Sequence, residues 1–212
     1  MKKPIVVINL KTYKQGENVL KLAKKIEKVN KNIIIGLQAP DIKEVASKTK
    51  LKVYSQHVDY FRPGRNTGFI LPEAVKKNKA VGTFLNHSEH KLPFKTLKKT
   101  IKRCKEIKLK TLVFASNLKE AEKIKKLKPN FIVIEPPELV GGKISVSKAK
   151  PELIKNIAKK LKYRFLVGAG IHTNEDVKTA IKLGASGIAV SSAICKAKNP
   201  SKVLKELISG LG

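Results

Sequence analysis

Eight short runs of apolar, mostly β-branched residues recur along the chain, separated by amphipathic or lysine-faced segments. The runs occupy residues 4–10, 32–38, 52–57, 80–86, 111–116, 131–136, 164–170 and 187–192. Because apolar residues are continuous rather than alternating, the runs predict strands buried on both faces, which is typical of a parallel sheet. Segments with helical spacing lie between them and include residues 17–30, 94–107, 117–128 and 173–183.

Eight strand–helix units in 212 residues predict an α/β fold, a single (β/α)8 barrel domain spanning residues 1–212. A doubly wound sheet is the structural alternative. That fold usually has a glycine-rich turn after its first strand, whereas this chain reads NLKTYKQG there. The chemistry of a (β/α)8 barrel lies at the C-terminal ends of its strands, so polar residues at those ends are the candidate site.

The net charge of +30, from 46 Lys and Arg against 16 Asp and Glu, raises the question of nucleic-acid binding. The lysines are spread over every helical segment, where they alternate with Leu and Ile. The sequence has no basic tail and no zinc-finger spacing. We therefore interpret the charge as a solvated lysine-rich surface without a specific nucleic-acid partner, although weak salt-sensitive binding is compatible with it.

Localisation signals are few. No apolar run approaches the ~20 residues that cross a bilayer, and MKKPIVVINL reads as a first strand rather than a signal peptide. Cys104 and Cys195 are far apart and form neither a disulfide framework nor a zinc spacing. These features predict a reduced, cytoplasmic protein with no membrane partner. The triplet NHS at Asn86 matches a glycan acceptor, but this short pattern is common by chance.

Charged or titratable residues end the first and fourth predicted strands. Asn9 and Lys11 lie on one side of the first strand with Leu10 opposite, although a lone strand-end lysine is more often a surface residue. His87 ends the fourth strand, and a short helix beginning there would disfavour a charged imidazole. Taken alone, His87 is equally well interpreted as a loop histidine without a role.

The neighbouring polar residues receive simpler interpretations. Ser88 is predicted to cap the short helix, and Glu89 is predicted to pair with a nearby cation. We interpret the remaining histidines, His57, His90 and His172, as structural or surface residues.

The stretch EPPELVGG, residues 135–142, ends the sixth run with a carboxylate. Pro136 and Pro137 have fixed φ angles, while Gly141 and Gly142 permit the other end to bend. This composition predicts a catalytic base, Glu135, joined to a lid, residues 136–143, that closes as a rigid unit. The alternative is a solvated strand-end glutamate.

Small residues follow the last two predicted strands. Gly168 and Gly170 permit backbone amides to approach a ligand, and Ser191 and Ser192 follow the eighth strand. The recurrent phosphate site of a (β/α)8 barrel is formed by the loops after strands seven and eight. The sequence therefore predicts a phosphate-binding wall.

The motifs INLKTY, NHSEH, IEPPELVGG and GAGIHTNED, in this order and spacing, resemble those of the triosephosphate isomerase family in its short archaeal-type form, a TIM barrel. The resemblance covers almost the whole chain. It implies interconversion of dihydroxyacetone phosphate and D-glyceraldehyde 3-phosphate through an enediolate, in glycolysis and gluconeogenesis, with no metal or organic cofactor.

The same resemblance implies roles for individual residues. Glu135 would be the base, His87 the electrophile and Lys11 the substrate-binding cation. Further substrate contacts would come from Asn9, Val140, Gly170, Ser191 and Ser192.

The chain departs from the family pattern at two positions. Gly141-Gly142-Lys143 stands where Gly-Thr-Gly usually ends the lid, and His172 stands where serine is common. The resemblance further implies a homodimer, or a homotetramer built from dimers, with Thr67 near the active site of a neighbouring subunit.

Two other functions stay open at this point. Another phosphate-binding barrel, such as a sugar-phosphate isomerase or a synthase of aromatic amino-acid biosynthesis, would share the phosphate wall but not Lys11, His87 and Glu135. A basic nucleic-acid-binding protein would require neither set.

Overall fold

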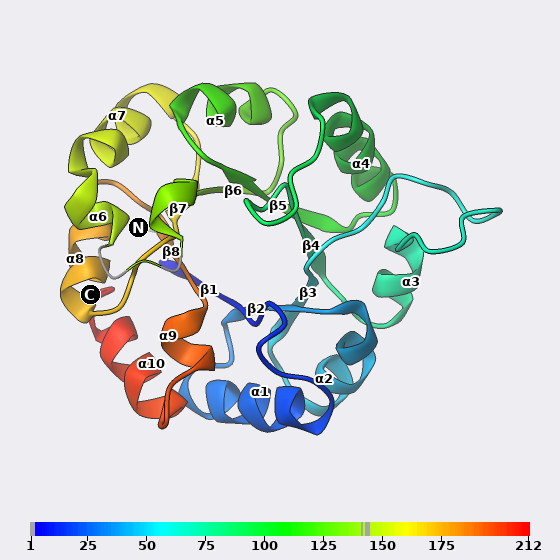
Figure 1. Cartoon of the computed structure of the whole chain (residues 1–212), viewed down its shortest axis with the longest axis horizontal. Coiled ribbons are helices and arrows are strands. Elements are labelled where there is room, and N and C mark those ends of the chain that lie inside the picture. Colours follow the sequence, from blue (N-terminus) through cyan, green and yellow to red (C-terminus); the bar gives the residue numbers. More distant parts are fainter. Residues whose placement is uncertain (1–2, 141, 143–144) are drawn as a thin grey trace.

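The structure, a computed structural model, describes residues 3–140, 142 and 145–212. In these residues eight parallel strands pair in sequence order, and the last pairs with the first to close a barrel (Figure 1). The strands are β1 (Ile5–Asn9), β2 (Ile34–Leu37), β3 (Lys52–Ser55), β4 (Gly82–Leu85), β5 (Lys110–Ala115), β6 (Phe131–Ile134), β7 (Phe165–Val167) and β8 (Gly187–Val190). Each predicted run contains one strand apart from a residue at an edge, so the predicted (β/α)8 barrel is confirmed.

Helices surround the barrel and cover its outer face (Figure 1). They are α1 (Glu17–Val29), α2 (Ile42–Lys48), α3 (Pro72–Lys77), α4 (Phe94–Glu106), α5 (Leu118–Lys125), α6 (Val146–Ala149), α7 (Pro151–Leu161), α8 (Asn174–Lys182), α9 (Ser192–Cys195) and α10 (Pro200–Ser209), with the 3-10 turns η1 (Ala39–Asp41) and η2 (Pro137–Leu139). The predicted helix over 117–128 is too long at its end, because Lys128 adopts a positive φ of 52° that terminates the helical path.

The core has two layers. The larger one lies between strands and helices, and α1 contributes Val19, Leu22 and Ile26 to it at helical spacing. The smaller one fills the barrel, where Tyr54 and Phe84 are the largest fully buried side chains. Glycines make room for these rings: a Cβ on Gly36 would lie 2.0 Å from Phe84, and a Cβ on Gly82 would lie 2.3 Å from Tyr54.

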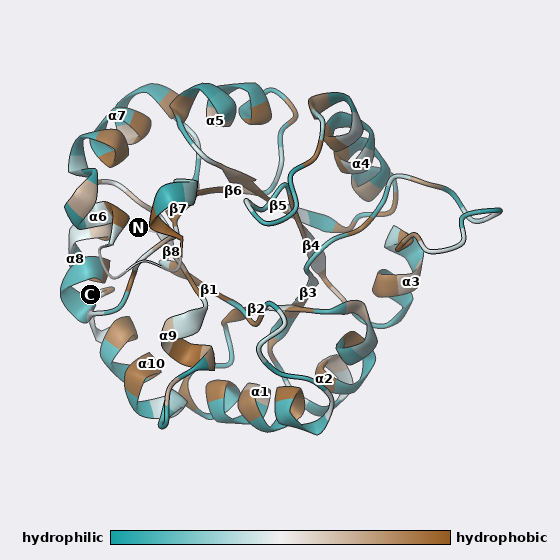
Figure 2. Ribbon diagram, viewed as in Figure 1, coloured by the Kyte–Doolittle hydropathy of each residue, from teal (hydrophilic) through white to brown (hydrophobic). Residues whose placement is uncertain are grey.

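The outward helix faces are hydrophilic and the faces toward the barrel are more hydrophobic (Figure 2). This arrangement agrees with the interpretation of the lysines as a solvated surface. Within the described residues, no helix has the length and apolar character needed to cross a membrane.

Candidate active site

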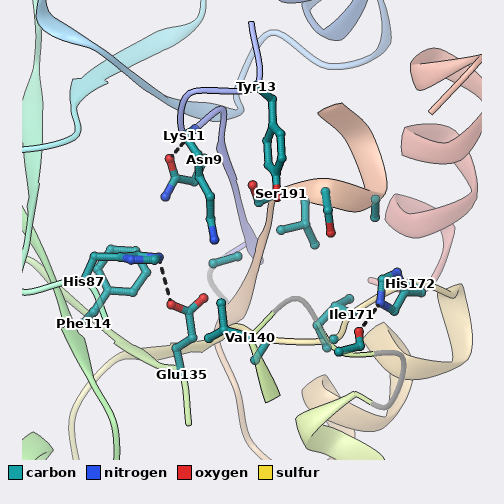
Figure 3. Close-up of a pocket in the computed structure, with 17 residues that line it drawn as sticks. Asn9, Lys11, Tyr13, His87, Phe114, Glu135, Val140, Ile171, His172 and Ser191 are labelled. Carbon is teal, nitrogen blue, oxygen red and sulfur yellow. Dashed lines mark hydrogen bonds and ion pairs between the residues drawn. The ribbon is translucent and has the colours of Figure 1, made fainter. Parts of the chain in front are cut away.

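A cleft of about 550 Å³, which includes some open solvent, lies at the C-terminal ends of the strands. Its walls come from the ends of β1, β4, β6, β7 and β8 and from the loops that follow them, and Figure 3 shows Lys11, His87 and Glu135 converging on it. All of the residues predicted for the site line this cleft, namely Asn9, Lys11, His87, Glu135, Val140, Gly170, Ser191 and Ser192. The structure therefore brings together residues that lie more than a hundred positions apart in the sequence.

Lys11 is held in the cleft by a tight turn after β1. The Lys11 backbone N–H donates to Asn9 Oδ1 at 2.9 Å, and Lys11 adopts a left-handed φ of 46°. Gln56 closes the turn by donating to the Lys11 carbonyl at 2.9 Å. The Lys11 ammonium lies 2.6 Å from Glu89 Oε1, which confirms the predicted cation partner. The turn rather than strand alternation places Lys11, because β1 ends at Asn9.

His87 has a defined tautomer. Its Nδ1 accepts a hydrogen bond from the Glu89 backbone N–H at 3.1 Å, so a neutral imidazole carries its proton on Nε2. The predicted short helix at this position is wrong: His87 lies in a loop, and α4 begins only at Phe94. The residues after His87 form only a single turn, in which the His90 N–H donates to the His87 carbonyl at 2.9 Å, and the Leu92 N–H bonds to the Asn86 side chain instead of continuing a helix.

Ser88 does not cap a helix, and its buried hydroxyl has no hydrogen-bond partner among the described residues. The predicted cap is therefore wrong.

Asn86 and Glu120 support the loop that carries His87, and sequence reasoning did not find this role. The buried Asn86 side chain donates to the Phe114 carbonyl at 2.9 Å and to Glu120 Oε1 at 2.8 Å, and it accepts from the Leu92 N–H at 3.0 Å. Its amide is therefore fully engaged, which contradicts use of Asn86 as a glycan acceptor. A φ of 60° also suits asparagine better than most residues.

Glu120 is charged in this setting. Burial alone would raise its pKa, but Lys91, the Ser116 N–H and the Asn86 amide donate to the carboxylate and together lower the pKa. The ion pair with Lys91 is 2.8 Å long. The support beneath His87 is therefore a charge-assisted network rather than a single bond.

Glu135 points a buried carboxylate into the cleft, with only 9 % of the residue exposed. Its Oε2 lies 3.0 Å from His87 Nε2 (Figure 3), yet the angles do not make a hydrogen bond, and Oε2 has no such partner among the described residues. A buried carboxylate oxygen without a donor is costly, and in this position it can accept a proton from a bound molecule.

Gly168 makes room for this carboxylate. A Cβ there would lie 2.8 Å from Glu135 Oε1. The Gly168 N–H is used within the sheet, where it donates to the Ile134 carbonyl at 2.9 Å. The prediction that the Gly168 amide approaches a ligand is therefore wrong, and the glycine is needed for space instead.

The wall predicted to bind phosphate is formed by residues after β7 and β8. Ala169 and Gly170 have consecutive positive φ values of 73° and 65°, which turn the chain into the cleft. Ser191 precedes α9, and its buried hydroxyl has no hydrogen-bond partner among the described residues. The wall therefore offers small side chains and a free hydroxyl beside the charged groups.

The described part of the lid comprises residues 136–140 and Gly142. Pro137 begins the turn η2, and Gly142 donates to the Leu139 carbonyl at 3.1 Å. The predictions for Gly141 and Lys143 lie outside the described residues. The interpretation of His172 as structural or surface needs correction, since it lines the cleft and its Nε2 lies 2.9 Å from the Gly142 carbonyl oxygen.

Comparison with known proteins gives a consistent result. Residues 4–209 match the family model described as triosephosphate isomerase. The chain is 40% identical to the triosephosphate isomerase of Methanothermus fervidus over 99% of both chains. It is 43% identical to that of Sulfurisphaera tokodaii, over 98% of this chain and 95% of the relative. It is 42% identical to that of Saccharolobus solfataricus, over 99% and 96% respectively.

Proposed function

The chain belongs to the triosephosphate isomerase family, an enzyme family that interconverts dihydroxyacetone phosphate and D-glyceraldehyde 3-phosphate in glycolysis, and we propose that Glu135, His87 and Lys11 carry out this reaction. Glu135 removes a proton from the carbon beside the substrate carbonyl and returns it to the neighbouring carbon. Support for this role comes from Glu135 Oε2, which is buried in the cleft and accepts no hydrogen bond among the described residues. The carbon-bound proton needs no second carrier, because one carboxylate reaches both carbons. The hydroxyl proton moves from one substrate oxygen to the other through His87 Nε2, so the reaction balances.

His87 and Lys11 stabilise the enediolate that forms between the two proton transfers. In the proposed mechanism, His87 donates its Nε2 proton in a hydrogen bond to the developing oxyanion. The support is the Glu89 N–H bonded to Nδ1, which leaves Nε2 as the donor. Lys11 adds positive charge to the same cleft, and preorganised charge of this kind stabilises a transition state more than a ground state.

The substrate phosphate binds at the opposite end of the cleft in this proposal. Gly170, Ser191 and Ser192 supply the wall, Val140 of the lid covers it, and Asn9 holds Lys11 in place. The lid excludes water, which also limits loss of phosphate from the enediolate. Support comes from the shared lining of a single cleft by all of these residues.

The single observation that carries the proposal is the 3.0 Å approach of Glu135 Oε2 to His87 Nε2 in a cleft that also holds Lys11. An isomerase assay with each triose phosphate at moderate salt tests the activity. A companion experiment in D2O tests the base: wild type incorporates solvent deuterium into product, whereas Glu135→Gln loses isomerisation and exchange together. Exchange at the wild-type rate in Glu135→Gln would assign the base to another residue.

The same assays separate the alternatives. Another phosphate-binding barrel would bind phosphate but not isomerise a triose phosphate, and a nucleic-acid-binding protein would do neither. No observation on the described residues favours either alternative over the isomerase.

We also propose a homo-oligomer, a homodimer or a homotetramer built from dimers. The segment between β3 and α3 projects from the barrel (Figure 1) and exposes Phe69. A second hollow of about 900 Å³ lies beside Lys11, Gln56 and Glu89. In the proposed assembly the projecting segment of a partner fills this hollow and brings Thr67 near the active site. Light scattering at ~0.15 M ionic strength checks this, and a monomer alone would exclude it. Repulsion from the net charge of +30 predicts a weaker oligomer at low salt.

Two broader proposals accompany the mechanism. Residues 1–212 form one domain, which a single calorimetric unfolding transition of the monomer or oligomer would support and two separate transitions would contradict.

The protein is cytoplasmic, a proposal supported by two free, buried cysteines whose burial raises the thiol pKa, to about 12 for Cys104 and about 11 for Cys195. Cell fractionation checks the location.

A further inference from the structure

A basic hollow lies on the outer wall of the barrel, between α5 and α7, which pack side by side (Figure 1). Its volume is about 1300 Å³, which includes open solvent, and none of the described residues that line it also lines the cleft at the strand ends. Apart from Glu122 and Tyr163, the lining consists of lysines, namely Lys119, Lys123, Lys125, Lys126, Lys128 and Lys160. We call this hollow the α5–α7 groove.

The lysines of the groove are not neutralised by neighbouring acids. Within the described residues none of them forms an ion pair, and Lys125 donates to the Leu161 carbonyl instead. On α1, by contrast, Lys21 pairs with Glu17 one turn away. Six lysines against a single glutamate leave the groove with five positive charges in excess. A hollow lined by one sign of charge concentrates ions of the opposite sign, so the groove attracts anions.

The charges are arranged as a row. Lys119, Lys123 and Lys126 are four and three positions apart along α5 and its C-terminal residue, so they lie on one face of the helix. At a rise of ~1.5 Å per residue, this row is about 10 Å long. Lys160, at the end of α7, lines the same groove from the other side. A row of charges suits an extended chain with repeated negative groups better than one compact anion.

Tyr163 is the aromatic member of the lining. Its hydroxyl donates to the Pro129 carbonyl, so the polar end of the side chain is engaged and the ring remains to line the groove. Aromatic rings bind the bases of single-stranded nucleic acids by stacking, while lysines follow the backbone phosphates. The combination of a lysine row with one aromatic ring therefore indicates an anion that carries flat bases as well as phosphates.

We propose that the α5–α7 groove binds single-stranded nucleic acid through its phosphate backbone, with one base against Tyr163 and without regard to sequence. Lysine ammonium groups contact phosphate oxygens as point charges and do not read bases. The interaction is separate from isomerisation, because the groove and the cleft share no lining residue. A second copy of the chain is a poorer occupant, since a two-fold interface would place the excess positive charge against itself.

Two triple variants of equal charge separate the groove from the net charge of the protein. The groove triple is Lys119→Gln, Lys123→Gln and Lys126→Gln. The control triple is Lys24→Gln, Lys28→Gln and Lys205→Gln, which changes exposed lysines of α1 and α10 that form no ion pair among the described residues. Fluorescence anisotropy with a short labelled oligouridylate, between about 0.05 and 0.2 M salt, measures the affinity. Inorganic polyphosphate and polyglutamate of matched charge are tested as competitors.

The groove triple should weaken binding of the oligouridylate by about 10- to 100-fold at ~0.1 M salt. It should also reduce the slope of log affinity against log salt by about 2, because each phosphate contact to a single strand contributes ~0.7. The control triple should change the affinity by no more than about threefold, since it removes only distant charge. Both triples should keep the kcat and KM of wild type for isomerisation, and their thermal unfolding is measured as a check on folding.

The aromatic contact is tested by Tyr163→Leu and Tyr163→Phe. Loss of the ring should weaken oligouridylate by at least about fivefold, whereas Tyr163→Phe keeps the ring and should bind like wild type. Binding of polyphosphate, which has no bases, should be the same in both variants. If Tyr163→Leu does not fold, an abasic strand of equal length replaces it as the probe, and wild type should bind this strand more weakly than oligouridylate.

Three results would overturn the proposal. Wild type that does not bind oligouridylate would exclude the partner. Equal losses in the two triple variants would show that net charge, and not the groove, attracts the strand. Polyphosphate or polyglutamate that binds as tightly as oligouridylate, together with no effect of removing the ring or the bases, would assign the groove to polyanions in general. None of these results bears on the proposed isomerase function, which its own assay tests.

Discussion

The loop that carries His87 and the lid that follows Glu135 leave the same end of the barrel, but they are held in different ways. The His87 loop is held by Asn86, whose buried side-chain amide donates hydrogen bonds to Phe114 of β5 and Glu120 of α5. The backbone hydrogen bonds of the described part of the lid lie mainly within the lid, and it reaches its neighbours through the Glu138 ion pair, the Gly142 carbonyl and the partly buried Leu139 side chain. Elements with few buried contacts open more easily.

This difference matches the roles proposed for the two loops. An electrophile must already be in place when charge develops, because preorganisation is what makes its hydrogen bond effective. A cover over the phosphate must instead open for substrate and product. Glu135 stands at the boundary: it follows β6 directly, and the proposed lid begins at the next residue.

The largest effect is expected at this boundary. Glu135→Asp keeps the charge but withdraws it by one methylene, and a misplacement of ~1 Å can reduce the rate by about 100-fold. We expect kcat to fall on that order while KM changes little. Glu138→Asp, in the same segment but exposed, is the control. Near wild-type activity in Glu135→Asp would remove Glu135 from the role of base.

Asp176 supports the loop that carries His172, because its Oδ2 accepts from the His172 and Thr173 N–H groups. This carboxylate predicts a stability that depends on pH. Asp176 has a folded pKa of about 2 against an ordinary value of 3.8, so its stabilisation is present above pH ~4 and is lost as pH falls toward ~2. Asp176→Asn should lower the free energy of unfolding near pH 7 by about 2 kcal/mol, since charge-assisted hydrogen bonds are lost. Urea unfolding at several pH values measures this. If the difference between wild type and variant did not shrink toward pH 2, the carboxylate would not be the cause.

A smaller effect is expected in the firmly held loop. Asn86→Ala removes three hydrogen bonds beneath His87, and the shifted imidazole should lower kcat by about tenfold. Asn130→Ala is a matched control, because its side chain accepts from the Thr111 N–H at 2.8 Å at the other end of the barrel. Both variants should lose stability, but only Asn86→Ala should lose kcat. Equal kcat in the two variants would mean that Asn86 serves folding alone.

The same comparison shows what the sequence could predict. Strands and strand-end residues follow from local patterns, which predict the barrel, whereas the roles expected for Lys11, His87 and Val140 come from the resemblance to the family. The supports depend on contacts between distant positions: Asn86 meets Glu120 across 34 residues, and His172 meets Gly142 across 30. No periodicity connects such pairs. The short helix predicted at His87 is wrong because the Leu92 N–H bonds to the Asn86 side chain rather than within a helix, a contact that no local pattern indicates.

The smallest expected effect concerns Gly142 itself. The three described heavy atoms nearest to a Cβ placed at this position all belong to the Leu139 backbone, so a residue with a small side chain can occupy it. Gly142→Thr reduces the number of open-lid conformations, an effect of about 0.4–1 kcal/mol, which should tighten phosphoglycolate binding by about two- to fivefold. A Cβ would lie 3.2 Å from the Leu139 carbonyl oxygen, so a small local shift opposes part of this gain.

Calorimetric titration of Gly142→Thr in two backgrounds measures the balance. With His172 present, the lid already has its bond to the loop after β7, and the gain from stiffening should be small. In His172→Ser that bond is absent, the open lid is more populated, and the same Gly142→Thr change should produce a larger gain. Adding Lys143→Gly, which completes the family's Gly-Thr-Gly pattern, should not reduce the gain unless the Lys143 charge attracts the phosphate, an attraction that salt would weaken. An equal gain in both backgrounds would show that the histidine and the lid act independently, and weaker binding in both would show that contact with Leu139 dominates.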